Sequence, residues 1–109
     1  MKNLYCSIGR AKKLKKLGFS QFGTSMYNFS KKEIQEWTKK DVRLYRLDIV
    51  NNYVRLCSTE ELREEIIKID SCFAVCCHGK EWGIYLQEGR YIYNKSLANL
   101  LADYLIHIS

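Results

Sequence analysis

The sequence has no uninterrupted apolar run near the roughly 20 residues that a membrane-spanning helix requires. Its first residues, Met1 to Cys6, contain no apolar stretch of the kind that opens a secretory signal. A G-x-x-x-x-G-K-[ST] phosphate-binding motif, internal repeats and low-complexity segments are also missing. These absences predict a cytoplasmic protein with no membrane partner, and they give no sign of a cofactor.

Cysteine is frequent but its pattern fits no established site. The five residues make an odd number in a chain without an export signal, which favours free thiols over disulfides. Cys72, Cys76, Cys77 and His78 suggest a metal site, yet on a strand Cys72 and Cys76 would lie about 13 Å apart, and paired C-x-x-C or H-x-x-x-H elements are missing. We therefore expect core thiols and no metal.

Histidine occurs only twice, and no catalytic motif accompanies either copy. A nucleophilic thiol at Cys76 or Cys77 assisted by His78 is the one enzymatic alternative, and it has no supporting pattern. Acidic residues at the start of the segment after Ser58 are explained by helix chemistry, because negative charge is favourable there. We expect a protein that is not an enzyme.

Length and hydrophobic periodicity predict one α+β domain over residues 1–109. The predicted elements are a strand at Asn3–Ile8, a helix at Arg10–Leu17, an irregular connection at Phe19–Phe29, a helix capped by Ser30 and Glu33, a hairpin of Val42–Val50 and Tyr53–Cys57 turning at Asn51-Asn52, a helix capped by Ser58 and Glu61, a meander of Ser71–Cys77, Trp82–Leu86 and Arg90–Tyr93, and a helix at Lys95–Ile108. This order gives a mainly antiparallel sheet, made of the hairpin plus the three-stranded meander, with helices packed on one face.

Positive charge is concentrated in the first part of the chain. Residues 1–46 hold twelve of the eighteen basic residues and three acids, whereas residues 47–109 hold six basic and nine acidic residues. A chain with one cationic and one mildly anionic part is suited to meet a polyanion in a preferred orientation. We therefore expect nucleic acid or a nucleoprotein as the partner.

The predicted binding residues lie in the cationic helix and beyond the connection that follows it. Phosphate contacts are expected from the helix and from two lysines further along, and base stacking from two aromatic residues of the connection. These residues are Arg10, Lys12, Lys13, Lys15, Lys16, Phe19, Tyr27, Lys31 and Lys32. The alternatives for the cations are a solvated helix face or docking on an acidic protein. The alternative for the aromatics is that they cover a small core, which we favour for Phe22 and Phe29.

Tyrosine also alternates along the predicted meander, at Tyr85, Tyr91 and Tyr93, with Trp82 nearby. We interpret these residues as core, and exposed tyrosines would instead suit a protein partner.

The leading functional hypothesis is a small non-enzymatic binding protein whose basic N-terminal half engages a polyanion. The alternative is a protein inhibitor or adaptor that docks on a host protein, such as a nucleic-acid-processing protein, in the manner of phage or mobile-element accessory (anti-defence) proteins. A homodimer stays open under both hypotheses.

Overall fold

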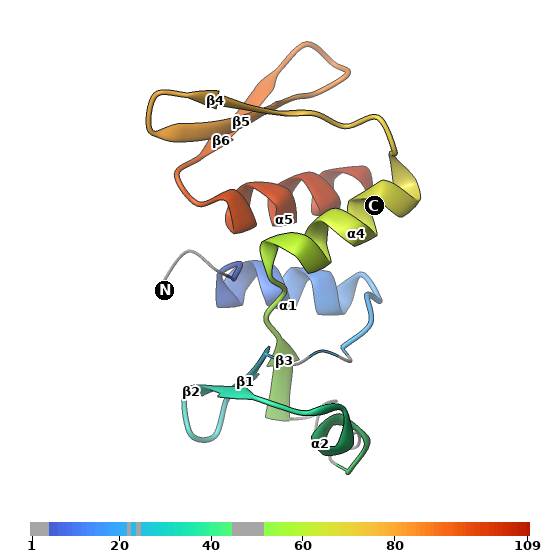
Figure 1. The fold of residues 1–109 in the computed structure, drawn as a ribbon, viewed down its shortest axis with the longest axis vertical. Helices are drawn as coiled ribbons and strands as arrows, with labels where there is room; N and C mark the ends of the chain where they lie inside the picture. The colour runs from blue at the N-terminus through green and yellow to red at the C-terminus, as the bar shows by residue number, and fades with distance from the viewer. Residues whose placement is uncertain (1–4, 22, 24, 45–51) are drawn as a thin grey trace.

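Helices lie between two sheets in this molecule. The computed structural model describes residues 5–21, 23, 25–44 and 52–109. Figure 1 shows α1 (Ile8–Lys16), α4 (Thr59–Ile69) and α5 (Leu97–Ile108) between two antiparallel three-stranded sheets, with α2 (Lys39–Leu44) at the far end. The predicted α+β class is confirmed, but the described strands form two separate sheets.

The first sheet has the order β2-β1-β3, with β1 (Ser25–Asn28) between β2 (Glu33–Glu36) and β3 (Tyr53–Arg55). The irregular connection predicted for Phe19–Phe29 is therefore wrong in its last part, where β1 lies. The helix predicted after Ser30 is also wrong, because strand β2 lies there. The reason is local, because the Asn28 side chain accepts hydrogen bonds from the backbone of Ser30 and Lys31. Lys32 then has a φ of 54°, which completes a tight reversal in place of a helix start.

Helix α2 lies where the sequence predicted the first strand of a hairpin. Thr38 and Asp41 exchange hydrogen bonds in the manner of a capping box, with Thr38 N donating to Asp41 Oδ2 at 2.9 Å and Asp41 N donating to Thr38 Oγ1 at 3.2 Å. The rest of that predicted strand, residues 45–50, and the predicted turn at Asn51 lie outside the described residues. The returning strand exists as β3 but pairs with β1.

The second sheet is the predicted meander, with β4 (Val75–His78), β5 (Glu81–Tyr85) and β6 (Tyr91–Asn94) in that order. The predicted helix at the end of the chain and the capping box of Ser58 and Glu61 are confirmed as well. The predicted strand at Asn3–Ile8 is wrong over its described part. Ser7 instead caps α1, and only Tyr5 forms an isolated bridge, to Ser58.

The main core is made where α1, α4 and α5 meet β3 and β5. Its fully buried side chains include Leu14, Val54, Leu62, Ile84 and Leu101. A smaller cluster, in which Met26, Trp37 and Val42 are buried, lies between the first sheet and α2. Burial of apolar surface therefore fixes α1 on one side only, which leaves its opposite side to solvent.

Within the described residues, none of the helices has the length and apolar character that crossing a membrane would take.

Candidate nucleic-acid interface

The sequence of α1 divides its surface into a buried stripe and a cationic remainder. Ala11 and Leu14 are buried against the core, whereas Lys12, Lys13 and Lys16 are exposed. The helix has no acidic residue in its first turn to offset this charge. Lysines in the last turn interact favourably with the free carbonyls there, but lysines four apart, such as Lys12 and Lys16, repel each other by a few tenths of a kcal/mol.

Arg10 is bound within the fold. Its Nε and Nη2 donate to the two carboxylate oxygens of Asp103 on α5, at 2.7 and 3.0 Å, and Nη1 donates to Ser7 Oγ at 3.1 Å. The hydrogen bond to Asp103 raises the pKa of the guanidinium above its ordinary value. Arg10 therefore orients α1 on α5, and its charge is already matched by a carboxylate.

Lys15 is also directed into the molecule. Its Nζ donates to the backbone oxygen of Tyr53 in β3 at 2.7 Å, and the side chain is half-buried. Burial lowers the pKa of this ammonium group. Arg10 and Lys15 together attach α1 to α5 on one side and to the first sheet on the other.

The remaining predicted cations are exposed on α1 and on the turn between β1 and β2. Lys12 Nζ lies 5.1 Å from the centre of the Phe29 ring, so α1 lies beside the turn between β1 and β2. That turn carries Lys31 and Lys32, which are both exposed. We call this set the lysine surface; its members are Lys12, Lys13, Lys16, Lys31 and Lys32. None of its ammonium groups forms an ion pair with another described residue.

The two predicted stacking residues lie partly in the core. Phe19 and Tyr27 are half-buried and pack against the main cluster, and Tyr27 contacts Phe29 edge-on at 5.3 Å between ring centres. Phe29 packs on the same cluster, as the core interpretation expects. Phe22 lies outside the described residues. Of these rings, Phe29 contacts the lysine surface directly, through Lys12.

The tyrosines of the meander are not core residues. Tyr85, Tyr91 and Tyr93 are 56%, 47% and 47% exposed, because α5 covers only the face of the sheet from which Ile84 and Leu86 project. Strand alternation places the tyrosines on the opposite face. The alternation was visible in the sequence, but which face α5 would cover was not.

The thiols divide by position. Cys6 and Cys57 are buried, and burial raises the pKa of both, to about 12 for Cys57. Cys72 and Cys77 are exposed, contrary to the core interpretation, because Cys72 precedes the edge strand β4 and Cys77 belongs to it. Among the described residues no group of three or more potential ligands is placed to hold a metal ion.

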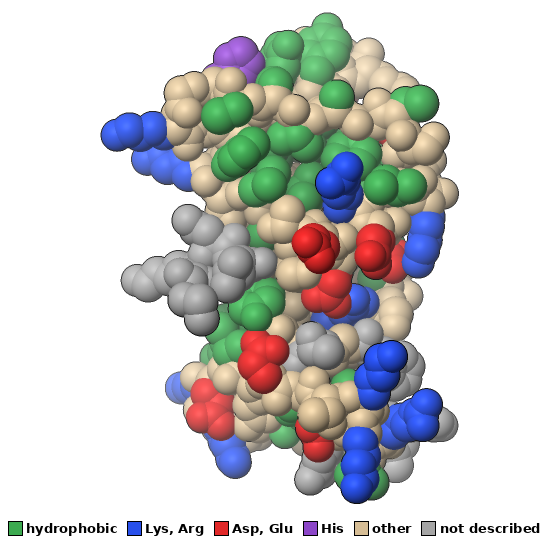
Figure 2. Space-filling model, in the orientation of Figure 1, with side chains coloured by type: hydrophobic (Ala, Val, Ile, Leu, Met, Phe, Trp, Pro, Cys, Tyr) green, Lys and Arg blue, Asp and Glu red, His purple; other side chains and the backbone are tan. Residues whose placement is uncertain are grey.

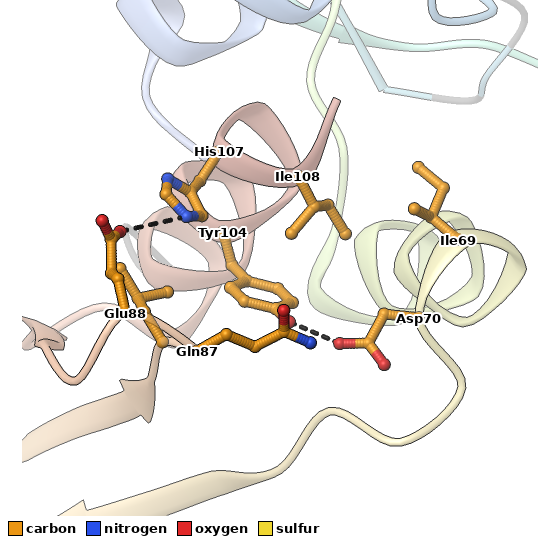
Figure 3. Close-up of a pocket in the computed structure, with 8 residues that line it drawn as sticks. Ile69, Asp70, Gln87, Glu88, Tyr104, His107 and Ile108 are labelled. Atoms are coloured by element: carbon orange, nitrogen blue, oxygen red, sulfur yellow. Dashed lines mark hydrogen bonds and ion pairs between the residues drawn. The ribbon is translucent and has the colours of Figure 1, made fainter.

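Figure 3 shows a pocket of about 500 Å³ between the ends of α4 and α5 and the β5–β6 turn. Tyr104 OH donates to Asp70 Oδ2 at 2.5 Å, and His107 Nε2 lies 3.3 Å from Glu88 Oε1. Burial and the Asp70 contact raise the pKa of Tyr104 to about 12. Both carboxylates are thus engaged by neighbouring side chains.

Figure 2 shows the face on which α4 lies in front. Acidic side chains cross its middle, cationic ones gather at the lower end over α2, and apolar ones gather in the upper half. The upper area includes a groove of about 390 Å³ lined by Arg63, Ile67, Phe73, Trp82 and neighbouring residues.

Comparison with models of protein families, with curated proteins and with solved structures found no match for this chain.

Proposed function

We propose that the protein is a non-enzymatic nucleic-acid-binding protein that contacts phosphates through the lysine surface. The observation that supports this proposal is a difference in how cationic side chains pair with carboxylates. Arg10, Arg55, Lys68 and Arg90 each contact a carboxylate, whereas the lysine surface has exposed ammonium groups without one among the described residues. Phosphates would supply the missing counter-charge and release condensed counterions on binding.

The geometry narrows the contacts expected from the sequence. Arg10 and Lys15 orient the helix, and Phe19 and Tyr27 pack against the main core, so phosphate binding falls to the exposed lysines of α1 and of the β1–β2 turn. If each of these lysines neutralised one phosphate of a single strand, log Kd would rise with log salt with a slope of about 3.5. Affinity would then fall about 100-fold between 50 and 200 mM salt.

The test is a fluorescence-anisotropy titration with single-stranded DNA, duplex DNA and RNA at these two salt concentrations. The variant Lys12→Gln with Lys16→Gln should bind more weakly and lower the salt slope by about 1.4, since two phosphate contacts are lost. The matched control is Lys39→Gln with Lys40→Gln, which removes the same charge from exposed positions on α2. Equal losses in both variants would refute the site, and no binding at 50 mM would refute the function.

A second candidate function is docking on another protein, and the groove beside Ile67, Phe73 and Trp82 favours it. Apolar and aromatic side chains with an arginine at the edge are typical of interface centres. In the titration, this inhibitor or adaptor function is the one supported if no nucleic acid binds.

A further inference from the structure

The outer face of the β4-β5-β6 sheet carries a group of aromatic side chains that the lysine surface does not include. We call it the tyrosine face; it consists of Tyr85, Tyr91, Tyr93 and His78. Tyr85 and Tyr91 are cross-strand partners with ring centres 4.8 Å apart. Tyr91 and Tyr93 are stacked at 5.6 Å, and the His78 ring lies 6.1 and 6.0 Å from them. The rings form one connected aromatic surface.

Gly83 in the central strand shapes this surface. A Cβ atom at this position would lie 3.1 Å from two ring carbons of Tyr93 and 3.5 Å from Cys76 Sγ. The Tyr93 ring therefore lies over the glycine, in space that a side chain would otherwise fill. The Tyr93 ring thus covers the central strand at the point where an ordinary residue would project its side chain into solvent.

This face is open in the described structure. The other face of the sheet is covered by α5, which buries Ile84 and Leu86, and Figure 1 shows no described element over the outer one. Three tyrosines on this face have about half of their surface exposed. The stability of the sheet does not explain them, because solvent-facing positions of antiparallel strands are usually polar. An unpartnered aromatic surface of this kind fits a flat ligand that stacks on it.

Charge selects the ligand. The register places Glu81 beside His78 and Trp82 beside Asn94, so Lys80 and Lys95 lie at the same end of the sheet, the end nearer to Tyr93 than to Tyr85. Both lysines are exposed, and neither pairs with a carboxylate among the described residues. They outnumber the half-buried Glu81 at that end. Aromatic rings bordered by ammonium groups match the bases and phosphates of a single strand.

We propose that the tyrosine face stacks the unpaired bases of a single-stranded nucleic acid, whose backbone runs toward Lys80 and Lys95. This inference rests on the proposed function and deepens it, because paired bases in a duplex cannot reach the rings. The protein should therefore bind single strands more tightly than duplexes. Each ring that loses a stacked base should weaken binding roughly tenfold.

The experiment uses a single-stranded oligonucleotide containing 2-aminopurine, whose fluorescence falls when the base stacks, and a duplex of the same sequence. Addition of the protein should quench the single strand and leave the duplex unchanged. Tyr91→Ser with Tyr93→Ser should remove the quenching and lower single-strand affinity at least tenfold. Tyr91→Phe with Tyr93→Phe should restore both, because phenylalanine keeps the ring and loses only the hydroxyl.

Two controls separate stacking from loss of structure. Ile69→Ser removes an apolar side chain of similar exposure, 51%, from the end of α4 and should leave quenching unchanged. Thermal unfolding by circular dichroism checks that the serine variant is folded. The wild-type quenching tests the inference without any variant.

The outcomes distinguish the two proposals. Binding of single strand and duplex with equal affinity and without quenching overturns the stacking inference and leaves the lysine surface as the binding site. Weaker binding by the Lys12→Gln, Lys16→Gln variant, with quenching still present at high protein concentration, supports both surfaces. If the wild type binds no oligonucleotide, the proposed function is wrong, and so is the inference; the tyrosine face would then be a protein-docking surface.

Discussion

Glu61 connects three segments of the fold. Replacing it should separate the stabilisation that comes from the α4 capping box from the stabilisation that comes from the contact with Arg55. Its Oε1 accepts from Ser58 N at 3.2 Å in the capping box of α4, and its Oε2 accepts from Arg55 Nε at 3.0 Å. Arg55 in turn donates to the backbone oxygen of Ser20 at 3.1 Å. The Arg55 side chain is only 12% exposed, so its cation depends on this carboxylate.

Two variants divide these contributions. Glu61→Gln keeps an acceptor for the capping box but leaves Arg55 without a counter-charge, and we expect a loss of about 2 kcal/mol in the free energy of unfolding. Glu61→Ala loses the cap as well and should cost about 3 kcal/mol in total. With a urea slope of about 1–3 kcal/mol per molar, the unfolding midpoint should move by about 0.7 M or more. Glu64→Ala, an exposed position on the same helix, should stay within about 0.5 kcal/mol of the wild type.

The difference between wild type and Glu61→Gln should also depend on pH. Burial alone would raise the pKa of Glu61, but the hydrogen bond and charge of Arg55 outweigh it and lower the pKa below the ordinary 4.5. A group with a lowered folded-state pKa stabilises the fold above its unfolded-state value and stops doing so as the pH falls through the folded one. The difference should therefore narrow below about pH 4.5. If Glu61→Gln unfolds at the wild-type urea concentration at pH 7, the ascribed role of this pair is wrong.

Two further predictions concern groups that the sequence could not place. Cys6 and Cys57 should resist a thiol reagent in the native protein, because burial raises their pKa. Absorbance of the released chromophore should count the exposed Cys72 and Cys77, and at most the half-buried Cys76, before unfolding and all five thiols after it. Arg10→Gln should lower the unfolding free energy by about 1 kcal/mol in urea unfolding, whereas Lys13→Gln should leave it unchanged. In anisotropy titrations, Arg10→Gln should weaken nucleic-acid binding less than Lys13→Gln does. If Arg10→Gln instead leaves stability unchanged and weakens binding more, Arg10 is a ligand contact.

The second half of the chain was predictable because its local signals agree with its packing. The capping box of Ser58 and Glu61, the meander and the last helix each have a period or cap that tertiary contacts confirm. The region between Ser30 and Leu44 was not predictable in this way. There the Ser30 and Glu33 pattern imitates a helix start, while Asn28 uses its side chain to reverse the chain and β1 supplies a partner for β2.

The candidate sites show the same division between local and tertiary information. Sequence alone locates the lysines of α1, because amphipathic spacing tells which side is buried. It does not show that Arg10 meets Asp103 or that Lys15 meets the backbone of Tyr53, since these partners come from distant segments. The tyrosine face was missed for a related reason, because alternation defines two faces of a strand and only packing of α5 decides which one is covered.

The attachment of α1 also has a consequence for how the protein is made. Two of its hydrogen-bonded anchors, Ser7 N to Asn99 Oδ1 at 2.7 Å and Arg10 to Asp103, join residues more than ninety positions apart. During translation, the cationic helix leaves the ribosome before α5 exists, so it has no α5 surface to pack against until the rest of the chain emerges. The orientation in which its lysines face solvent is therefore set last, when α5 folds against it.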